Sequence, residues 1–332
     1  MAGYNLKEGK LNTTVVSDDK YWSLFNYVFS SSCMKRNTYK FGLIKSILDS
    51  IFGAESKNDL IFISYETLFA KFASNYWNLI VKYNLKQMRR DGKSEISAIE
   101  QIFYNKLKSQ PVARILEFDD LTEKNQSEII TAVMISCKRY VLGALYEDTE
   151  GYIYEFNKAG EGIYIAKSAH EFMMRYKSEL EKLNYFAWAK FLEQINDDSV
   201  LCRLLDKLEL STPRRNDLTI FRRILEKEFE ENTCFYCGKK LKSIVHVDHF
   251  IPWSFVKEDL LWNFVLACPE CNTRKNNRVP NYDFLKKIQL RNYNICQQEN
   301  GMKIQASYGE YNECRLYNLW EYARLSGLKI WK

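Results

Sequence analysis

Four cysteines in the last third of the sequence place the strongest constraint on how this chain can fold. Cys234 and Cys237 form one Cys-x2-Cys pair, and Cys268 and Cys271 form a second pair after thirty intervening residues. Each pair presents two thiolates, and the long segment between the pairs can fold back to unite them around one tetrahedral zinc ion. Because four thiolates leave no open coordination position for water, the sequence predicts a structural zinc site.

Composition predicts a helical chain. It contains 13 glycines and 5 prolines in 332 residues, about 5% of the chain where an average protein carries roughly 12%. A chain so poor in turn-forming residues is expected to consist mostly of long helices.

The sequence also predicts a cytoplasmic protein with no membrane partner. The first ten residues include Lys7, Glu8 and Lys10 and lack the apolar core of a signal peptide. No stretch approaches about 18 uninterrupted apolar residues. In a reducing compartment, clustered cysteines are expected to bind metal and not to form disulfides.

Helical periodicity dominates from Tyr21 to about Leu210. Apolar residues recur at the spacing of one helix face, for example in residues 43–51 and 129–137. One interruption, at residues 146–156, predicts a turn and a short strand that can form a hairpin with residues 163–165.

A domain boundary is predicted just before the cysteine pairs. Residues 211–216 collect turn-forming and charged side chains and are the best linker candidate. An amphipathic helix then leads into Cys234. We expect a mainly helical recognition or regulatory domain at residues 1–212, a zinc-stapled module at residues 213–282 and a helical extension at residues 283–332.

The segment between the two cysteine pairs contains the residues best suited to catalysis. Residues 244–247 have strand propensity and Pro252 forces a departure from it, which puts Asp248 and His249 at the strand end, facing opposite sides. A lone Asp-His pair would usually be an ordinary surface feature. This chain has three histidines, however, and two of them, His246 and His249, lie within four residues inside this segment.

Three motifs together resemble the HNH endonuclease family. They are Asp248-His249, the run Asn-Phe-Val-Leu-Ala-Cys-Pro-Glu-Cys-Asn from Asn263 to Asn272, and Arg274-Lys275. The resemblance implies the ββα-metal fold, in which a strand carries Asp-His, a second strand begins at an Asn, and a helix supplies a final His or Asn. We therefore expect a mainly α N-terminal domain followed by an α+β HNH nuclease module with a four-cysteine zinc site.

The resemblance assigns a role to each matching residue. His249 would be the general base that takes a proton from the attacking water, a task that suits the ordinary pKa of histidine. Asp248 and Asn272 would bind Mg²⁺ or Mn²⁺ through oxygen. Asn263 would orient the loop that carries His249 and would not bind metal. Asn272 stands where some members of the family have His, which weakens the case for a soft metal.

Basic residues near the expected site are candidates for contacts with nucleic acid. Three of them follow the second cysteine pair at helical spacing, where they can reach phosphates that flank the cut, and others follow the first pair. His246 points to the same strand face as Asp248, so a phosphate or metal-shell contact and a purely structural role are both open. The candidates are Arg274, Lys275, Arg278, His246, Lys239 and Lys240.

The favoured function is hydrolysis of DNA phosphodiester bonds by a metal-dependent HNH endonuclease in restriction or anti-phage defence. Residues 39–46 are similar to helical domains that precede HNH modules in bacterial defence proteins. Two alternatives stay open: an RNA-directed or partner-activated nuclease effector, and a zinc module that binds nucleic acid without cutting it. A homodimer and a sensor or regulatory subunit are both open as partners, since a double-strand cut needs two such sites.

Overall fold

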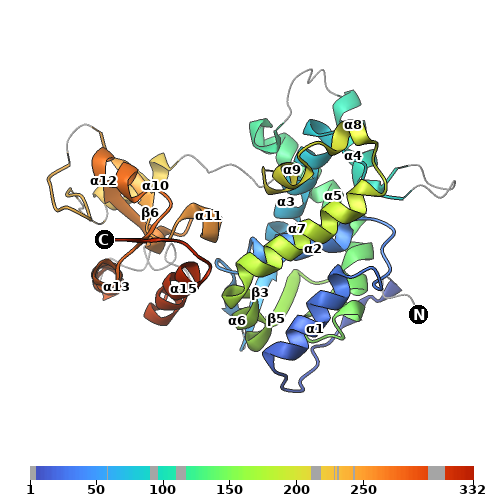
Figure 1. Ribbon diagram of the computed structural model, residues 1–332, viewed down its shortest axis with the longest axis horizontal. Coiled ribbons are helices and arrows are strands. Elements are labelled where there is room, and N and C mark those ends of the chain that lie inside the picture. Colours follow the sequence, from blue (N-terminus) through green and yellow to red (C-terminus); the bar gives the residue numbers. More distant parts are fainter. Residues whose placement is uncertain are drawn as a thin grey trace. The chain divides into compact units, whose positions relative to one another are not determined.

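The chain forms two compact units in the computed structural model, residues 1–214 and residues 215–332, and we describe each by itself (Figure 1). The structure describes residues 5–57, 59–89, 96–109, 117–210, 218–227, 229, 232–241, 244–297 and 311–332. The expected linker at residues 211–216 lies outside the described residues.

Helices make up most of the N-terminal unit. They surround α5 (Glu123–Asp148), which packs against the helices α1, α2, α3 and α4. A π-helix, η2 (Asn78–Lys82), continues α3, and a 3-10 turn, η3 (Phe118–Asp120), precedes α5. The α-helices are α1 (Asp18–Phe29), α2 (Tyr39–Leu48), α3 (Tyr65–Trp77), α4 (Ala98–Ser109), α5, α6 (Lys167–Arg175), α7 (Lys177–Glu193), α8 (Asp198–Leu201) and α9 (Leu204–Leu210).

The core of this unit is aromatic. The Tyr76 ring on α3 lies 4.6 Å from Phe72 and 5.4 Å from Trp188 on α7, between ring centroids. All three side chains are buried. Gly42 lets α2 pack closely against α3, because a Cβ atom added at this position would lie 2.3 Å from the Tyr76 ring on α3.

The helix α5 is long and apolar enough to cross a membrane by length and composition alone. In this structure the apolar face that carries Ile129, Val133 and Cys137 is buried, and the helix packs against α3 and α4. A core helix of a globular protein passes the same test, so packing within the unit accounts for these apolar side chains.

A five-stranded antiparallel sheet accompanies the helices of the N-terminal unit. The hairpin predicted near residues 152–165 is present as β4 (Tyr154–Asn157) and β5 (Gly162–Ala166), with Glu155 opposite Tyr164. The other strands are β1 (Glu8–Gly9), β2 (Glu55–Lys57) and β3 (Leu60–Ser64), and the order across the sheet is β1-β4-β5-β3-β2.

Sequence periodicity missed three of these strands. The strand β3, which lies between β5 and β2, buries three consecutive residues, Ile61, Phe62 and Ile63. An alternating pattern of exposed and buried residues is therefore absent from it, and a short apolar run without alternation cannot be told from a helix segment. The predicted turn at residues 146–151 was placed too early, because α5 continues to Asp148.

The C-terminal unit combines two short sheets with helices. A strand β6 (His246–His249) pairs with β7 (Phe264–Ala267), and β8 (Val279–Pro280) pairs with β9 (Ile330–Trp331). The helices are α10 (Thr219–Lys227), α11 (Trp253–Val256), α12 (Pro269–Lys275), α13 (Tyr282–Gln297) and α15 (Glu313–Leu325), and a 3-10 turn, η4 (Leu261–Asn263), precedes β7. The expected fold class, mainly α followed by a small α+β module, is confirmed.

The residues that follow Pro280 pack onto the same unit. Arg291 and Asn292 on α13 donate hydrogen bonds to the carbonyl oxygens of Phe264 at 2.7 Å and Trp262 at 2.9 Å. The C-terminal strand brings Trp331 against Tyr236, with ring centroids 4.8 Å apart. Trp331 also stacks on Phe284 at 5.6 Å. The expected helical extension is therefore part of the packing around the first cysteine pair.

Replacing Trp331 with alanine should destabilise the C-terminal unit by about 3–5 kcal/mol, because a large buried ring is lost and a cavity is left between Tyr236 and Phe284. Urea denaturation of the full chain measures the change. Leu325→Ala, at an exposed position at the end of α15, is the matched control and should change the unfolding free energy by less than about 0.5 kcal/mol. Equal effects of the two substitutions would contradict this account of the C-terminus.

Candidate active site

The four predicted zinc ligands converge in the structure. The Sγ atoms of Cys234, Cys237, Cys268 and Cys271 all lie within 4.8 Å of one another. The sulfurs of Cys237 and Cys268 are 3.9 Å apart, too far for a disulfide bond of about 2.05 Å. Four thiolates at about 2.3 Å from a tetrahedral zinc ion lie about 3.8 Å from one another. The arrangement therefore fits a structural zinc ion.

The backbone around the first cysteine pair prepares one sulfur for metal binding. Burial by itself would raise the pKa of the Cys234 thiol. Hydrogen bonds from backbone groups of Cys237, Cys268 and Tyr236 outweigh this effect and lower the pKa to about 7. Burial and the neighbouring sulfurs raise the pKa of Cys271. A zinc ion at the centre of the four sulfurs would offset the repulsion between neighbouring thiolates. It would therefore favour the deprotonated form of the cysteines, which is the form that binds zinc. Gly238 closes the turn with φ +70°, a conformation that glycine adopts without strain.

The expected ββα arrangement follows the cysteine pairs. In the antiparallel pair of β6 and β7, Asp248 lies opposite Val265 and His249 lies opposite Phe264. The helix α12 begins directly after β7, with Cys268 as its N-cap and Pro269 at its first position, and it packs against β6. Because neighbouring side chains on a strand point to opposite faces, Asp248 and His249 have different surroundings.

Asp248 is held by two donors from the metal-binding segments. The Tyr236 hydroxyl, between the first two cysteines, donates to Asp248 Oδ2 at 2.5 Å. The Lys275 ammonium, at the end of α12, lies 3.1 Å from Oδ1 and 3.0 Å from Oδ2. Burial and the Asp248 charge raise the pKa of the Tyr236 phenol well above its ordinary value. The phenol therefore stays protonated and remains a donor to the carboxylate.

The structure corrects the expected role of Lys275. Its side chain is 1% exposed, and it also donates a hydrogen bond to the His249 carbonyl oxygen at 2.7 Å. The residue was predicted to contact phosphates, because helical spacing placed it beside Arg274. It instead lies on the inner face of α12, where its charge neutralises Asp248 and fixes the end of β6.

Asn263 is hydrogen-bonded to the segment that follows His249. It is fully buried, and its side chain accepts a hydrogen bond from the Ile251 amide at 2.8 Å and donates one to the Ile251 carbonyl oxygen at 3.0 Å. Its own carbonyl oxygen accepts from the Phe250 amide at 2.7 Å. These three hydrogen bonds fix the backbone of Phe250 and Ile251, the two residues that follow His249. They therefore restrict the backbone position of His249 itself.

Asn272 contacts His246 on the neighbouring strand. Its amide nitrogen Nδ2 donates to His246 Nδ1 at 2.9 Å. This bond leaves the Asn272 amide oxygen as the atom that can accept a cation. The contact that the structure shows for His246 is therefore with the Asn272 side chain, a partner that the sequence did not predict.

His249 has a partner that sequence reasoning missed. Its Nε2 atom lies 3.0 Å from Asp259 Oδ1, and the two side chains are 4% and 7% exposed. Phe264 and Trp253 flank the imidazole ring edge-on, with centroids at 4.6 and 5.3 Å. Asp259 lies in the connection between α11 and η4. No motif marks it in the sequence, because its distance from His249 depends on how that connection folds.

The other predicted nucleic-acid contacts lie on the surface of the C-terminal unit. Arg274, Arg278, Lys239 and Lys240 are exposed. Glu270 lies 3.8 Å from Arg274 and 3.9 Å from Lys239, distances that correspond to loose ion pairs. Such surface pairs contribute little free energy, so both side chains can exchange this partner for a phosphate.

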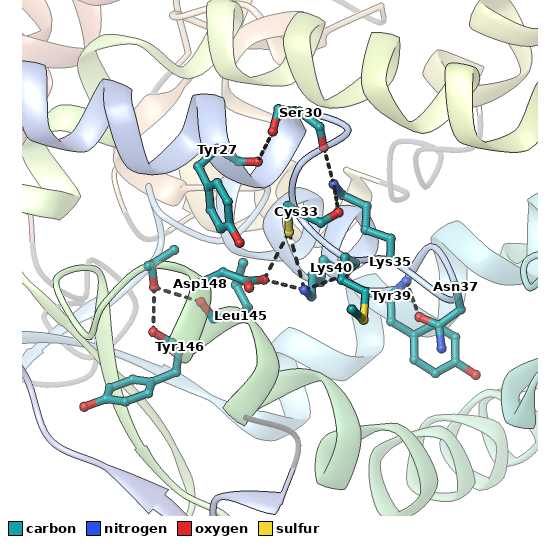
Figure 2. A network of polar contacts seen from close by, with 12 residues as sticks. Tyr27, Ser30, Cys33, Lys35, Asn37, Tyr39, Lys40, Leu145, Tyr146 and Asp148 are labelled. Atoms are coloured by element: carbon teal, nitrogen blue, oxygen red, sulfur yellow. Dashed lines mark hydrogen bonds and ion pairs between the residues drawn. The ribbon is translucent and has the colours of Figure 1, made fainter. Parts of the chain in front are cut away.

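The N-terminal unit contains a polar network around Cys33, Lys40 and Asp148 (Figure 2). Lys40 lies 2.5 Å from Asp148 and 3.5 Å from the Cys33 sulfur, beside a cavity of about 490 Å³. Burial raises the pKa of the Cys33 thiol, which is the opposite of what a cysteine nucleophile needs. Lys35 donates to the carbonyl oxygens of Ser30 and Cys33. These contacts join the segment after α1 to the end of α5.

Comparison with known protein families decides the nature of the C-terminal module. The family model of the HNH endonucleases matches residues 234–278, which include both cysteine pairs and the β6, β7 and α12 elements. Residues 234–278 form an HNH endonuclease domain. No curated protein and no solved structure matches the chain.

The HNH domain contains donor atoms that fit a catalytic divalent metal. An ionised carboxylate offers about four acceptor positions, and the hydrogen bonds from Tyr236 and Lys275 occupy two of them. The remaining acceptor capacity of Asp248 and the amide oxygen of Asn272 are hard oxygen donors, which suit Mg²⁺ or Mn²⁺. Water and phosphate oxygens would have to complete the coordination.

Substituting Cys268 with serine should remove zinc from the HNH domain and loosen its fold. The expected zinc content of the wild-type protein is one ion per chain, and the binding free energy of structural zinc, on the order of 10–16 kcal/mol, is folding free energy. Elemental analysis and limited proteolysis measure the two effects. Cys314→Ser, at an exposed cysteine outside the cluster, should keep the zinc. A zinc-free wild-type protein that resists proteolysis would contradict the assignment.

Proposed function

We propose that this protein is a metal-dependent endonuclease that hydrolyses DNA phosphodiester bonds, with His249 as the general base. The observation that carries the proposal is the HNH match at residues 234–278, in which β6 presents Asp248 and His249 side by side in the chain. Zinc at the four cysteines would hold this strand and α12 together, and it would take no part in the reaction.

The chemistry of the site suits hydrolysis of a phosphodiester. His249 takes a proton from a water molecule as the water oxygen bonds to phosphorus, and the bond to the 3′ oxygen breaks. Mg²⁺ or Mn²⁺, when bound, would stabilise the negative charge that develops on the phosphate oxygens and the leaving oxygen. Asp248 and Asn272 would hold the ion, while Lys275 and Tyr236 keep the Asp248 carboxylate in place.

Substrate binding is proposed on the exposed basic side chains of the HNH domain. Arg274 and Arg278 lie at and just beyond the end of α12, which carries Asn272, and Lys239 and Lys240 follow the first cysteine pair. Their exposure leaves them available to phosphates on either side of the scissile bond. Contacts of this kind position a nucleic acid without reading its sequence, so we propose that recognition or regulation belongs to the N-terminal unit.

We further propose that the protein acts in the cytoplasm in restriction or anti-phage defence. A nuclease of this kind has to be restrained in the cell that makes it, either by modification of the host DNA or by a trigger. The neighbouring genes discriminate between these arrangements. A methyltransferase gene would support restriction, and an ATPase or sensor gene would support a triggered effector with a protein partner.

Substitution His249→Ala should lower DNA cleavage by about 10²–10⁴-fold, the range that a general base contributes, while zinc content stays unchanged. Nicking and linearisation of a supercoiled plasmid with Mg²⁺ or Mn²⁺ measure the rate, with a structured RNA as a parallel substrate. Tyr293→Ala, at an exposed position on α13, is the control and should cut at the wild-type rate. Cleavage by His249→Ala at the wild-type rate would rule out the assignment.

The cleaved DNA should carry 5′-phosphate and 3′-hydroxyl ends, because the 3′ oxygen is the leaving group. Self-ligation of the untreated product by a DNA ligase tests this directly. A product that can be ligated only after treatment with a polynucleotide kinase would show that the 5′ oxygen leaves instead.

A further inference from the structure

The contact between His249 and Asp259 is buried and specific. The carboxylate oxygen Oδ1 lies 3.0 Å from the ring nitrogen Nε2. The two side chains are 4% and 7% exposed, and the rings of Trp253 and Phe264 border the imidazole. Exposed pairs are weak and exchange with water, whereas removing one partner of a buried pair leaves the other without compensation.

The chemistry of the two groups determines which ring nitrogen carries hydrogen. An ionised carboxylate only accepts hydrogen bonds, so Nε2 must carry the hydrogen that points toward Asp259. In a neutral imidazole the other nitrogen, Nδ1, is then the acceptor. The contact therefore selects one of the two tautomers and fixes the rotation of the imidazole ring about the Cβ–Cγ bond.

The local fold brings Asp259 to this place. Helix α11 ends at Val256, and Lys257 adopts a left-handed conformation with φ 56° that turns the chain. Asp259 then precedes η4, whose last residue, Asn263, fixes the loop after His249. The same short connection thus anchors the histidine at its backbone and at its ring.

We propose that Asp259 is a positioning residue that holds His249 with hydrogen on Nε2, so that Nδ1 is the atom that accepts the proton of the attacking water. This inference rests on the proposed function. Nδ1 takes one proton from water, the water oxygen bonds to phosphorus, the bond from phosphorus to the 3′ oxygen breaks, and the 3′ oxygen takes a proton from solvent. The imidazolium returns its proton to solvent.

The two buried aspartates of the domain therefore have different tasks. Asp248 contacts Lys275 and Tyr236 on one side of β6, where its negative charge pairs with the Lys275 ammonium group. Asp259 contacts the ring on the other side, and its charge also stabilises the imidazolium that forms during the reaction.

The test uses Asp259→Asn in the full-length, zinc-loaded protein. Asparagine keeps the size of the side chain but can donate to Nε2, which permits the other tautomer. Long-range ¹H–¹⁵N NMR of protein labelled at histidine nitrogen distinguishes the two tautomers of a neutral ring. The chain has three histidines, so variants at His170 and His246 assign the signals.

The wild-type His249 ring should show hydrogen on Nε2, and Asp259→Asn should populate the form with hydrogen on Nδ1. Plasmid cleavage by Asp259→Asn should lose about 10²–10⁴-fold in kcat, with KM changed by less than about threefold, because the substrate contacts remain. Asp259→Glu, which keeps the carboxylate, should recover part of the rate and the wild-type tautomer. Asp283→Asn removes the same charge from an exposed position on α13 and should change neither measurement.

An unchanged His249 spectrum in Asp259→Asn, or hydrogen on Nδ1 in the wild-type protein, would overturn the inference. So would wild-type kcat in Asp259→Asn when His249→Ala is inactive, and in that case the proposed function would stand. A wild-type protein without His249-dependent cleavage would overturn the proposed function. The NMR spectra would then still decide whether Asp259 sets the tautomer.

Discussion

The cluster of four cysteine sulfurs is the constraint on which the HNH domain depends. It joins two segments that are thirty residues apart in the chain, and each segment delivers a residue to the Asp248 carboxylate. Tyr236 lies between the first two cysteines, and Lys275 lies one helical turn beyond the last. A zinc ion that held the sulfurs together would therefore also fix Asp248, because its two partners belong to the zinc-binding segments.

Charge is buried on both sides of β6, and both buried aspartates described there have a partner. Asp248 is neutralised by Lys275, and Asp259 contacts His249. Pairs of this kind add little net stability, since desolvation offsets most of their attraction, but breaking one is costly. Their value in this domain is geometric: they fix the end of the strand and the histidine ring before any substrate binds.

The sequence predicted the elements whose pattern is local. Helices such as α2 and α5 were recognised because their apolar residues recur at helical spacing along the sequence. The zinc ligands and the Asp248-His249 pair were recognised because their spacing is a property of the chain itself. The sheet of the N-terminal unit was mostly missed, because β3 buries consecutive residues and so lacks an alternating pattern.

The sequence by itself therefore predicted the cluster of four cysteines, the fold class and the HNH family of residues 234–278. The tertiary structure alone decided the partners of the reactive groups. It turned Lys275 inward to Asp248, joined His246 to Asn272 and brought Asp259 to His249. These contacts depend on how α12 packs on β6 and on the path of the chain after α11. Direction and burial of a side chain follow from such packing, whereas spacing along the sequence gives only its position.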